Sequence, residues 1–222
     1  MSHPSFAPPG DAAHATPTVL IGAGGHAAAL IEVIRAAGLL HPVGCLDQSA
    51  TAPVLGVPVI GDEARLEALR HEGVAAVVVC IGHNATRLRW IGRARALGYA
   101  LPVVAHPAAI LSPSARLGAG SVVLPRAVLG ARALAGEGTI LNTGTIVEHD
   151  CELGHGVHVA PGAVLGGGVR VGDGALIGIG AALRPLVRVG REAVVGTGAA
   201  VVEDVADGAT VGGVPARPLA RE

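Results

Sequence analysis

Aromatic side chains are almost absent from this chain of 222 residues, which holds one Trp, one Tyr and one Phe although half of its residues are hydrophobic. Small aliphatic side chains must therefore fill the core, which favours a narrow and regular interior. Neither sign of charge is in excess, because 16 Lys and Arg stand against 17 Asp and Glu. We therefore expect no nucleic acid or membrane surface as a partner, and instead a small molecule and further copies of the chain.

Cysteines and long apolar runs are also scarce. Cys45, Cys80 and Cys151 are widely spaced and form no CxxC pair, which is typical of a cytoplasmic chain with reduced thiols. The longest apolar run, near residues 74–81, is far shorter than the roughly 20 residues that span a bilayer. The Pro- and Ala-rich residues 1–17 lack the pattern of a secretory signal, and we predict that they form a mobile tail.

Residues 18–106 alternate short apolar runs with segments of helical spacing, which predicts a small parallel α/β domain. The expected strands are TVLIGAG, PVGCLD, PVIGD and VAAVVVCIG, and the expected helices are HAAALIEVIRAAG, EARLEALRHEG and ATRLRWIGRARALG.

After Pro107 the sequence period changes to six. Fifteen hexads run without an insertion from Ala115 to Asp204, and the third position holds Leu, Val or Ile in fourteen of them, Ala135 being the exception. Gly follows the third position in nine hexads. A repeat of this kind predicts a parallel β-helix, in which each hexad gives a short strand with an inward aliphatic and a tight turn. We place this domain at 107–214 and a carboxy-terminal tail at 215–222.

Three histidines cluster in the segment TIVEHDCELGHGVHVA, at His149, His155 and His158, and Glu148 and Asp150 flank the first of them. They could bind a metal, move a proton or occupy turns. The γ-class carbonic anhydrases use a similar prism with three His ligands but space their close pair differently, so we expect no metal. Proton transfer suits His149, because imidazole titrates near neutrality and a neighbouring carboxylate can fix its tautomer. Spacing alone leaves open which of the two acids does so.

The glycine-rich turn GAGGHA follows the first expected strand and opens the first expected helix, as a turn that cradles phosphate does. It is close to GxGxxA, and Asp47 follows at the distance of a ribose-binding acid, so a dinucleotide site is a competing interpretation. The sheet ends by His106, after too few strands for a full dinucleotide fold. One nucleotide therefore fits better than two.

The chain resembles the sialic acid O-acetyltransferase and bacillosamine-type N-acetyltransferase family of sugar acetyltransferases. The resemblance covers Val19 to Pro218 and rests on IGAGGHA, CIGHN, HPAAILSPSA, the run from ILNTGTIVEHD to ALIGIGA, and the closing VGGVPARPL. It implies a nucleotide-binding α/β domain followed by a left-handed β-helix with three hexads per coil, hence about five coils. It also implies acetyl-CoA as co-substrate, no metal, and a homotrimer with active sites between subunits.

The resemblance also implies roles for individual residues. His149 matches the catalytic base and Asp150 its supporting acid. His155 has no counterpart and is expected to occupy a turn, and Cys151 is expected to pack in the core. The residues expected near acetyl-CoA are Asn142, His158, Gly167, Gly178 and Ile179. Those expected near the nucleotide sugar are Gly24, Gly25, His26, Asp47, Gly82, His83 and Asn84.

These implications predict an N-acetyltransferase acting on the amine of a UDP- or GDP-linked 4-amino-4,6-dideoxy sugar by direct transfer. Two alternatives remain open from the sequence. An O-acetyltransferase acting on sialic acid or another sugar hydroxyl would use the same residues. A sugar-nucleotide-binding or structural β-helix would leave the His–acid pair without a use.

Overall fold

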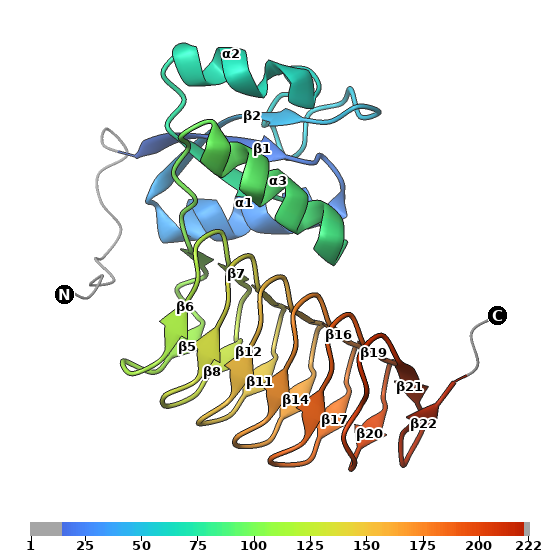
Figure 1. Ribbon diagram of the computed structural model, residues 1–222. Coiled ribbons are helices and arrows are strands. Elements are labelled where there is room, and N and C mark those ends of the chain that lie inside the picture. Colours follow the sequence, from blue (N-terminus) through green and yellow to red (C-terminus); the bar gives the residue numbers. More distant parts are fainter. Residues whose placement is uncertain (1–14, 220–222) are drawn as a thin grey trace.

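The computed structural model describes residues 15–219 and shows a small α/β domain docked on the first coils of a three-sided β-helix (Figure 1). The predicted fold class is confirmed. Residues 1–14 and 220–222, which hold most of the predicted amino-terminal tail and the end of the predicted carboxy-terminal one, lie outside the described range. No helix within that range is long and apolar enough to cross a membrane.

The α/β domain is built on a three-stranded parallel sheet with the order β2-β1-β3. Its elements, in chain order, are β1 (Thr16–Ile21), α1 (Gly25–Ala37), β2 (Leu40–Leu46), the 3₁₀ turn η2 (Glu63–Arg65), α2 (Leu66–His71), β3 (Ala76–Val79) and α3 (Asn84–Ala96). The segment PVIGD, expected as a strand, forms only an isolated bridge between Val59 and Cys45. The second expected helix is divided into η2 and α2.

Both faces of this sheet are covered, which explains the continuous apolar run of β3. Val78 and Cys80 pack with α1 on the side that faces the β-helix, while Val77 and Val79 pack with α2 and α3 on the other side. The layer that includes α1 also contains outward residues of the first β-helix coils, such as Val122 and Ile140. The two domains therefore share one core layer, with α1 between the sheet and the solenoid (Figure 1).

The β-helix has three faces, each a sheet of two- or three-residue strands. The first face holds β4 (Val104–Ala105), β7 (Val122–Val123), β10 (Ile140–Leu141), β13 (His158–Val159), β16 (Leu176–Ile177), β19 (Val194–Val195), β21 (Thr210–Gly212) and β22 (Arg217–Pro218). The second face holds β5 (Ile110–Leu111), β8 (Val128–Leu129), β11 (Ile146–Val147), β14 (Val164–Leu165), β17 (Ala182–Leu183) and β20 (Ala200–Val201). The third face holds β6 (Arg116–Leu117), β9 (Leu134–Ala135), β12 (Glu152–Leu153), β15 (Arg170–Val171) and β18 (Arg188–Val189).

Three hexads make one coil, as the register shows: Ile140 pairs with His158, eighteen positions further along the chain. The inward aliphatics of successive coils stack, for example Val147 on Leu165 and Leu153 on Val171. The first position of each hexad also points inward, and Cys151, which occupies one of these positions, is fully buried. Its predicted packing role is thus confirmed, and the narrow bore accounts for the lack of aromatic residues.

The predicted domain boundaries shift at both ends. β1 begins at Thr16, inside the predicted tail 1–17, because its first residues pair with β2. The solenoid begins at β4 rather than after 106, and the second face holds six strands, so there are about six turns rather than five. Near the carboxy terminus, β22 returns antiparallel to β21, so the predicted tail 215–222 contains an ordered strand.

Candidate active site

His149 and Asp150 lie in the turn between β11 and β12, at the corner where the second and third faces meet. The imidazole Nδ1 lies 2.7 Å from Asp150 Oδ2. The ring covers Gly167 of the next coil, where a Cβ atom would lie 2.7 Å from both Cε1 and Nε2. A glycine at 167 is therefore needed for this ring position, a steric role that adds to its expected place near acetyl-CoA.

Asp150 also binds Arg132, which occupies the same corner one coil earlier. Arg132 Nε donates to Asp150 Oδ1 at 2.6 Å, and Nη2 donates to Oδ2 at 2.7 Å. These bonds, followed by the bond to His149, lower the pKa of Asp150 to about 2. An ionised carboxylate only accepts, so Nδ1 of the neutral ring carries the proton and Nε2 keeps a free lone pair.

The geometry also separates the two acids beside His149. Glu148 makes only a long contact, 3.4 Å, from its Oε2 to the backbone N–H of His149, whereas Asp150 contacts the ring itself. Cys151 points into the bore, where its thiol donates to the Gly166 carbonyl at 3.2 Å, and burial raises its pKa. Such a thiol is poorly suited to act as a nucleophile.

A second group of polar residues lies on the first face, beneath the α/β domain. Asn142 Nδ2 lies 3.2 Å from His158 Nε2. The pKa of His158 is lowered to about 4, mainly by burial and also by repulsion from Arg87 and His26, against the opposing effect of a hydrogen bond to the Gly82 backbone. The pKa of His26 is likewise lowered to about 4 by burial and by Arg87. Both rings are therefore neutral near pH 7, in contact with the amino-terminal domain.

The buried guanidinium of Arg87 joins the two domains and was not predicted. Only 1% of this residue is exposed, and burial lowers its pKa to about 10. It donates to the carbonyls of Ile81, Gly82, Gly138 and Gly156 and to the side-chain oxygen of Asn84, over distances of 2.7 to 3.1 Å. All five of its N–H donors are used, so the loop after β3 is fastened to two coils of the β-helix.

The glycine turn at the start of α1 is open, as an anion site requires. A Cβ atom at Gly24 or Gly25 would meet nothing within 4 Å, and the first turn of α1 has no acidic residue or side-chain cap. Asp47 lies behind this turn, where its Oδ2 accepts the Ala23 N–H at 2.9 Å. Its other oxygen accepts the backbone N–H groups of Ser49 and Ala50, and these bonds lower its pKa to about 2. Asp47 thus holds the glycine turn in place through a hydrogen bond that the sequence alone does not indicate.

The loop after β3 brings Gly82, His83 and Asn84 to the same edge of the sheet as the glycine turn. The His83 ring caps α3 by accepting the Thr86 N–H. The Asn84 amide donates to the carbonyl of Gly174 at 2.8 Å. Both side chains are therefore engaged in holding the loop, and Gly82 keeps open space beside its Cα.

The other expected site residues lie at further corners of the prism. Gly178 and Ile179 are in the turn between β16 and β17, where the first and second faces meet, and Ile179 is 55% exposed. Asn142 lies at this same corner two coils earlier. His155 is in a turn between the third and first faces, where its Nδ1 accepts the Glu137 N–H at 3.0 Å, so its expected place in a turn is confirmed.

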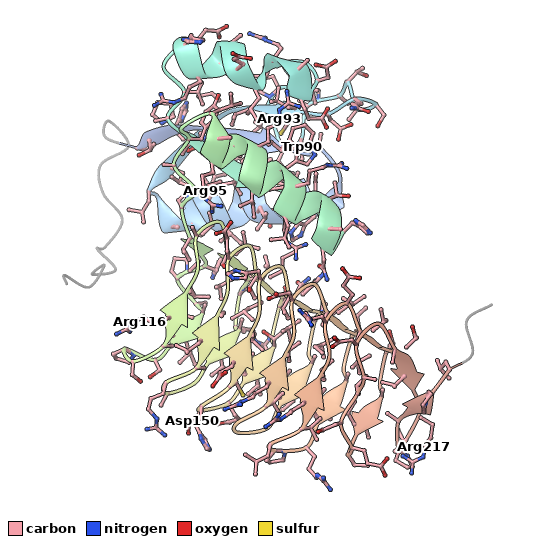
Figure 2. The ribbon with its side chains drawn as sticks, in the orientation of Figure 1. Trp90, Arg93, Arg95, Arg116, Asp150 and Arg217 are labelled. Atoms are coloured by element: carbon pink, nitrogen blue, oxygen red, sulfur yellow. The ribbon has the colours of Figure 1, made fainter. Side chains whose placement is uncertain are left out.

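Within one chain, then, the three clustered histidines do not converge. His149 is at the corner opposite the first face, His158 is on the first face, and His155 is in a turn between the third and first faces. In Figure 2 the labelled Asp150 lies at the edge of the solenoid away from the α/β domain. Residues 15–219 contain no group of three or more His, Cys, Asp or Glu side chains placed to hold a metal ion.

Two arginines of this site have sequence positions that indicate their contacts. Arg87 falls four residues before Ile91 and seven before Ala94, so it lies on the buried stripe of α3. Arg132 precedes Asp150 by one full coil and occupies the same hexad position. Aligning the hexads in threes would have placed this cation next to the acid.

An α/β domain joined to a β-helix with a His–Asp pair on one corner is the architecture of the hexapeptide-repeat acyltransferases. The model of the PglD N-terminal domain matches residues 18–94. A variant of GDP-perosamine N-acetyltransferase from Caulobacter crescentus, solved with CoA and GDP-perosamine, is 41% identical over 92% of this chain and 97% of its own, with a TM-score of 0.90.

Two further solved structures agree. The acetyltransferase domain of PglB from Neisseria gonorrhoeae FA1090, in complex with acetyl coenzyme A, is 41% identical over 92% of this chain and 100% of its own, with a TM-score of 0.88. WeeI from Acinetobacter baumannii AYE is 26% identical over the same shares, with a TM-score of 0.82. A search of curated proteins gave no match. The chain belongs to the hexapeptide-repeat nucleotide-sugar acetyltransferase family, which confirms the resemblance.

Proposed function

We propose that this protein is an acetyl-CoA-dependent N-acetyltransferase that acetylates the amine of a nucleotide-linked 4-amino-4,6-dideoxy sugar. The observation that carries the proposal is the His149–Asp150 pair at an exposed corner, in a chain 41% identical to a GDP-perosamine N-acetyltransferase. The GDP-perosamine held by that relative favours GDP over UDP as the nucleotide. The N-acetyltransferase relatives favour an amine over the sugar hydroxyl of the alternative.

His149 acts as the general base of a direct transfer. The sugar nitrogen attacks the thioester carbonyl, and Nε2 removes the amine proton as the C–N bond forms. The tetrahedral intermediate then collapses, the C–S bond breaks, and the imidazolium returns a proton to the CoA thiolate. Asp150 holds Nδ1–H throughout and stabilises the imidazolium. The buried Cys151 thiol supports direct transfer rather than an acyl-enzyme.

Binding of the nucleotide sugar is assigned to the turn before α1 and to the loop after β3. The free backbone N–H groups of Gly25 and His26, at the positive end of α1, suit the diphosphate, and Gly24 leaves room for it. Gly82 offers similar open backbone at the neighbouring strand end. Asp47, His83 and Asn84 contribute indirectly, because their side chains hold these two segments in place.

The site needs a second copy of the chain. His149 lies at the corner opposite the first face, whereas Asn142, His158 and the nucleotide-binding turn lie on or beside that face. The second face offers a contact surface, because its outward positions form an aliphatic ladder without any charge. The ladder consists of Ile110, Val128, Ile146, Val164, Ala182 and Ala200.

Packing of this ladder around a threefold axis places the His149 corner of one chain beside the corner between the first and second faces of its neighbour. Gly178 and Ile179 at that second corner are then available to the pantetheine of acetyl-CoA, together with Gly167 beside His149. Asn142 and His158 of the neighbour approach the reacting groups. A homotrimer with three shared sites is therefore part of the proposal.

The state of the three cysteines supports a proposal for the cellular compartment of the protein. Cys45, Cys80 and Cys151 are all free and buried, which suits a reducing compartment such as the cytoplasm.

Replacing the base tests the mechanism. His149→Ala is expected to lower kcat by about 10²–10⁴-fold, the usual contribution of a general base, without changing the fold or the binding of acetyl-CoA. CoA release would be followed with GDP- and UDP-linked amino sugars and with hydroxyl sugars. The matched control is Glu148→Gln, which changes the flanking acid that does not reach the ring. Unchanged turnover in His149→Ala would remove this mechanism, and release with hydroxyl sugars alone would favour O-acetylation.

A further inference from the structure

Within residues 15–219, the side chain of Arg132 forms hydrogen bonds with the side chain of Asp150 alone, and it binds both oxygens of that acid. The two residues pair across adjacent coils at the same corner, and both have a left-handed backbone, with φ of 58° and 60°. The backbone N–H of Arg132 is itself held by Ser114 Oγ of the preceding coil at 3.0 Å. Three consecutive contacts thus run from Ser114 through Arg132 and Asp150 to His149.

Stability does not explain this arginine. Its side chain is 68% exposed and that of Asp150 is 41% exposed, and ion pairs between exposed side chains contribute little to folding. The bonds of Arg132 instead fix the orientation of the Asp150 carboxylate. The planar guanidinium binds two carboxylate oxygens at once, which fixes the rotation of the carboxylate as a single bond cannot.

Oδ2 of Asp150 is the atom at which the two contacts meet. It accepts from Arg132 Nη2 at 2.7 Å and lies 2.7 Å from His149 Nδ1. A shift of the carboxylate would therefore turn the imidazole and move Nε2 away from its place over Gly167. A positive charge next to the acid also opposes the gain of a proton by the base.

We propose that Arg132 is a positioning residue for acetyl transfer, which orients the Asp150 carboxylate and, through that acid, the ring of His149, while its charge offsets that of Asp150. The inference rests on the proposed function of His149. It concerns a residue that does not touch the ring in this structure and that acts through the acid.

The charged groups around the His149–Asp150 pair come from its own turn and from the neighbouring coils. Arg132 approaches from the preceding coil, and Glu148 and Asp150 flank the ring in its own turn. The following coil places uncharged Gly167 against the ring. The hollow that Arg132 and Asp150 line also holds three further charged side chains, those of Glu152, Arg170 and Arg188. Loss of Arg132 leaves three acids against two arginines, a net negative surrounding, which stabilises the imidazolium.

The test is the pH profile of kcat/KM for the intact enzyme with acetyl-CoA and an amino-sugar substrate. Arg132→Met is expected to move the acidic limb to higher pH by about half a unit to one unit, because the charge of Asp150 is no longer compensated. Asp150→Asn is expected to move the limb in the opposite direction. At pH 7 we expect Arg132→Met to lose about 3- to 10-fold in kcat/KM, with little change in Tm.

Two further variants separate charge from orientation and from structure. Arg132→Lys restores the positive charge but cannot bind both carboxylate oxygens in the same bidentate geometry. The acidic limb of the profile should therefore return towards its original pH, while kcat stays reduced. Arg191→Met is the matched control, because Arg191 is an exposed arginine in an ion pair with Asp207 at the corner between the third and first faces, and its profile should equal that of the parent. In an Asp150→Asn background, Arg132→Met should add almost nothing, because the arginine acts through that acid.

The inference fails if Arg132→Met leaves both the limb and kcat/KM at pH 7 unchanged, or moves the limb to lower pH. That result is distinct from failure of the proposed function, in which His149→Ala itself retains full turnover.

Discussion

The corner that carries His149 and the first face beneath the α/β domain hold histidines in opposite environments. His149 is 58% exposed and bonds to an acid, which is in turn compensated by an arginine. His26 and His158 are shielded, close to the cation of Arg87, and have pKa values lowered to about 4. Nε2 of His26 has no hydrogen-bond partner in the range 15–219.

In the proposed mechanism, this difference divides the functions of one active site between two places on each chain. The exposed corner offers an imidazole that an ionised acid holds by one ring nitrogen, which leaves the other ring nitrogen open to a substrate. The covered face offers neutral rings beside a nucleotide-binding turn, where hydrogen bonds can form without a change of charge. The exposed corner lacks a nucleotide-binding turn, and the first face lacks an exposed base paired with an acid. We therefore infer that the two parts of the site meet only when two chains associate.

The largest effect is expected from a variant that keeps the His149 corner of one chain away from the first face of its neighbour. Ile146→Asp puts a charge into the aliphatic ladder of the second face, between Val128 and Val164. Burying an unpaired carboxylate between chains is unfavourable by several kcal/mol, so we expect the proposed trimer to dissociate and activity to fall by more than about 100-fold. Mass measurement by light scattering and CoA release would report both effects.

The control for that variant is Leu134→Asp. Leu134 occupies the equivalent outward position on the third face, among charged neighbours, and is 46% exposed. We expect it to stay trimeric and active. Equal behaviour of the two variants would contradict the assignment of the second face to assembly.

A milder change acts at the exposed corner alone. Gly167→Ala adds a Cβ atom 2.7 Å from the present position of the His149 ring, so the ring must turn away. Because catalysis depends on placing Nε2 within hydrogen-bond reach of the amine, we expect kcat to fall about tenfold or more. Gly92→Ala, a glycine of α3 with open space around it, is the control. Full activity of Gly167→Ala would show that the ring position is not restricted by this glycine.

The smallest expected effect concerns the covered face and its response to acid. The pKa values of His26 and His158 are lower in the folded chain than the ordinary value near 6.5, so below that pH the unfolded chain binds more protons. Stability should therefore decrease as the pH falls from about 6.5 towards 4, by up to about 3 kcal/mol for each histidine. Denaturant unfolding between pH 7 and 4.5 measures this, and His158→Asn should flatten the profile. A profile already flat in the parent would contradict the shielding of both rings.

The sequence predicted the solenoid well because its inward positions repeat without interruption. Leucine, valine and isoleucine at the third hexad position became the stacked ladders of the bore, and Cys151 became part of the same packing. The boundaries were less accurate because the first coil uses strands such as β4 that precede the regular repeat. The strand expected at PVIGD depends on pairing partners that local sequence does not specify.

The sequence indicated candidate ligand-facing residues, which stay predictions, but it did not indicate the contacts that support them. His149 and Asp150 stand out by residue type and are adjacent, as the sequence suggested. Arg87 and Arg132 act through partners that lie a whole coil or a whole domain away, and only the fold brings them together. For the same reason the sequence does not indicate the contacts of Asp47 and Asn84, whose side chains bind backbone groups far away in the chain.

Mixing two inactive variants tests the shared site most directly. His149→Ala lacks the base at the exposed corner, and His158→Ala lacks the neutral ring on the covered face. If one site uses His149 from one chain and His158 from its neighbour, co-expressed mixed trimers regain roughly a quarter of the parent activity, because random assembly makes that share of the sites complete. If each site lies within one chain, the mixture stays as inactive as the separate variants, and the account of two places joined by assembly is contradicted.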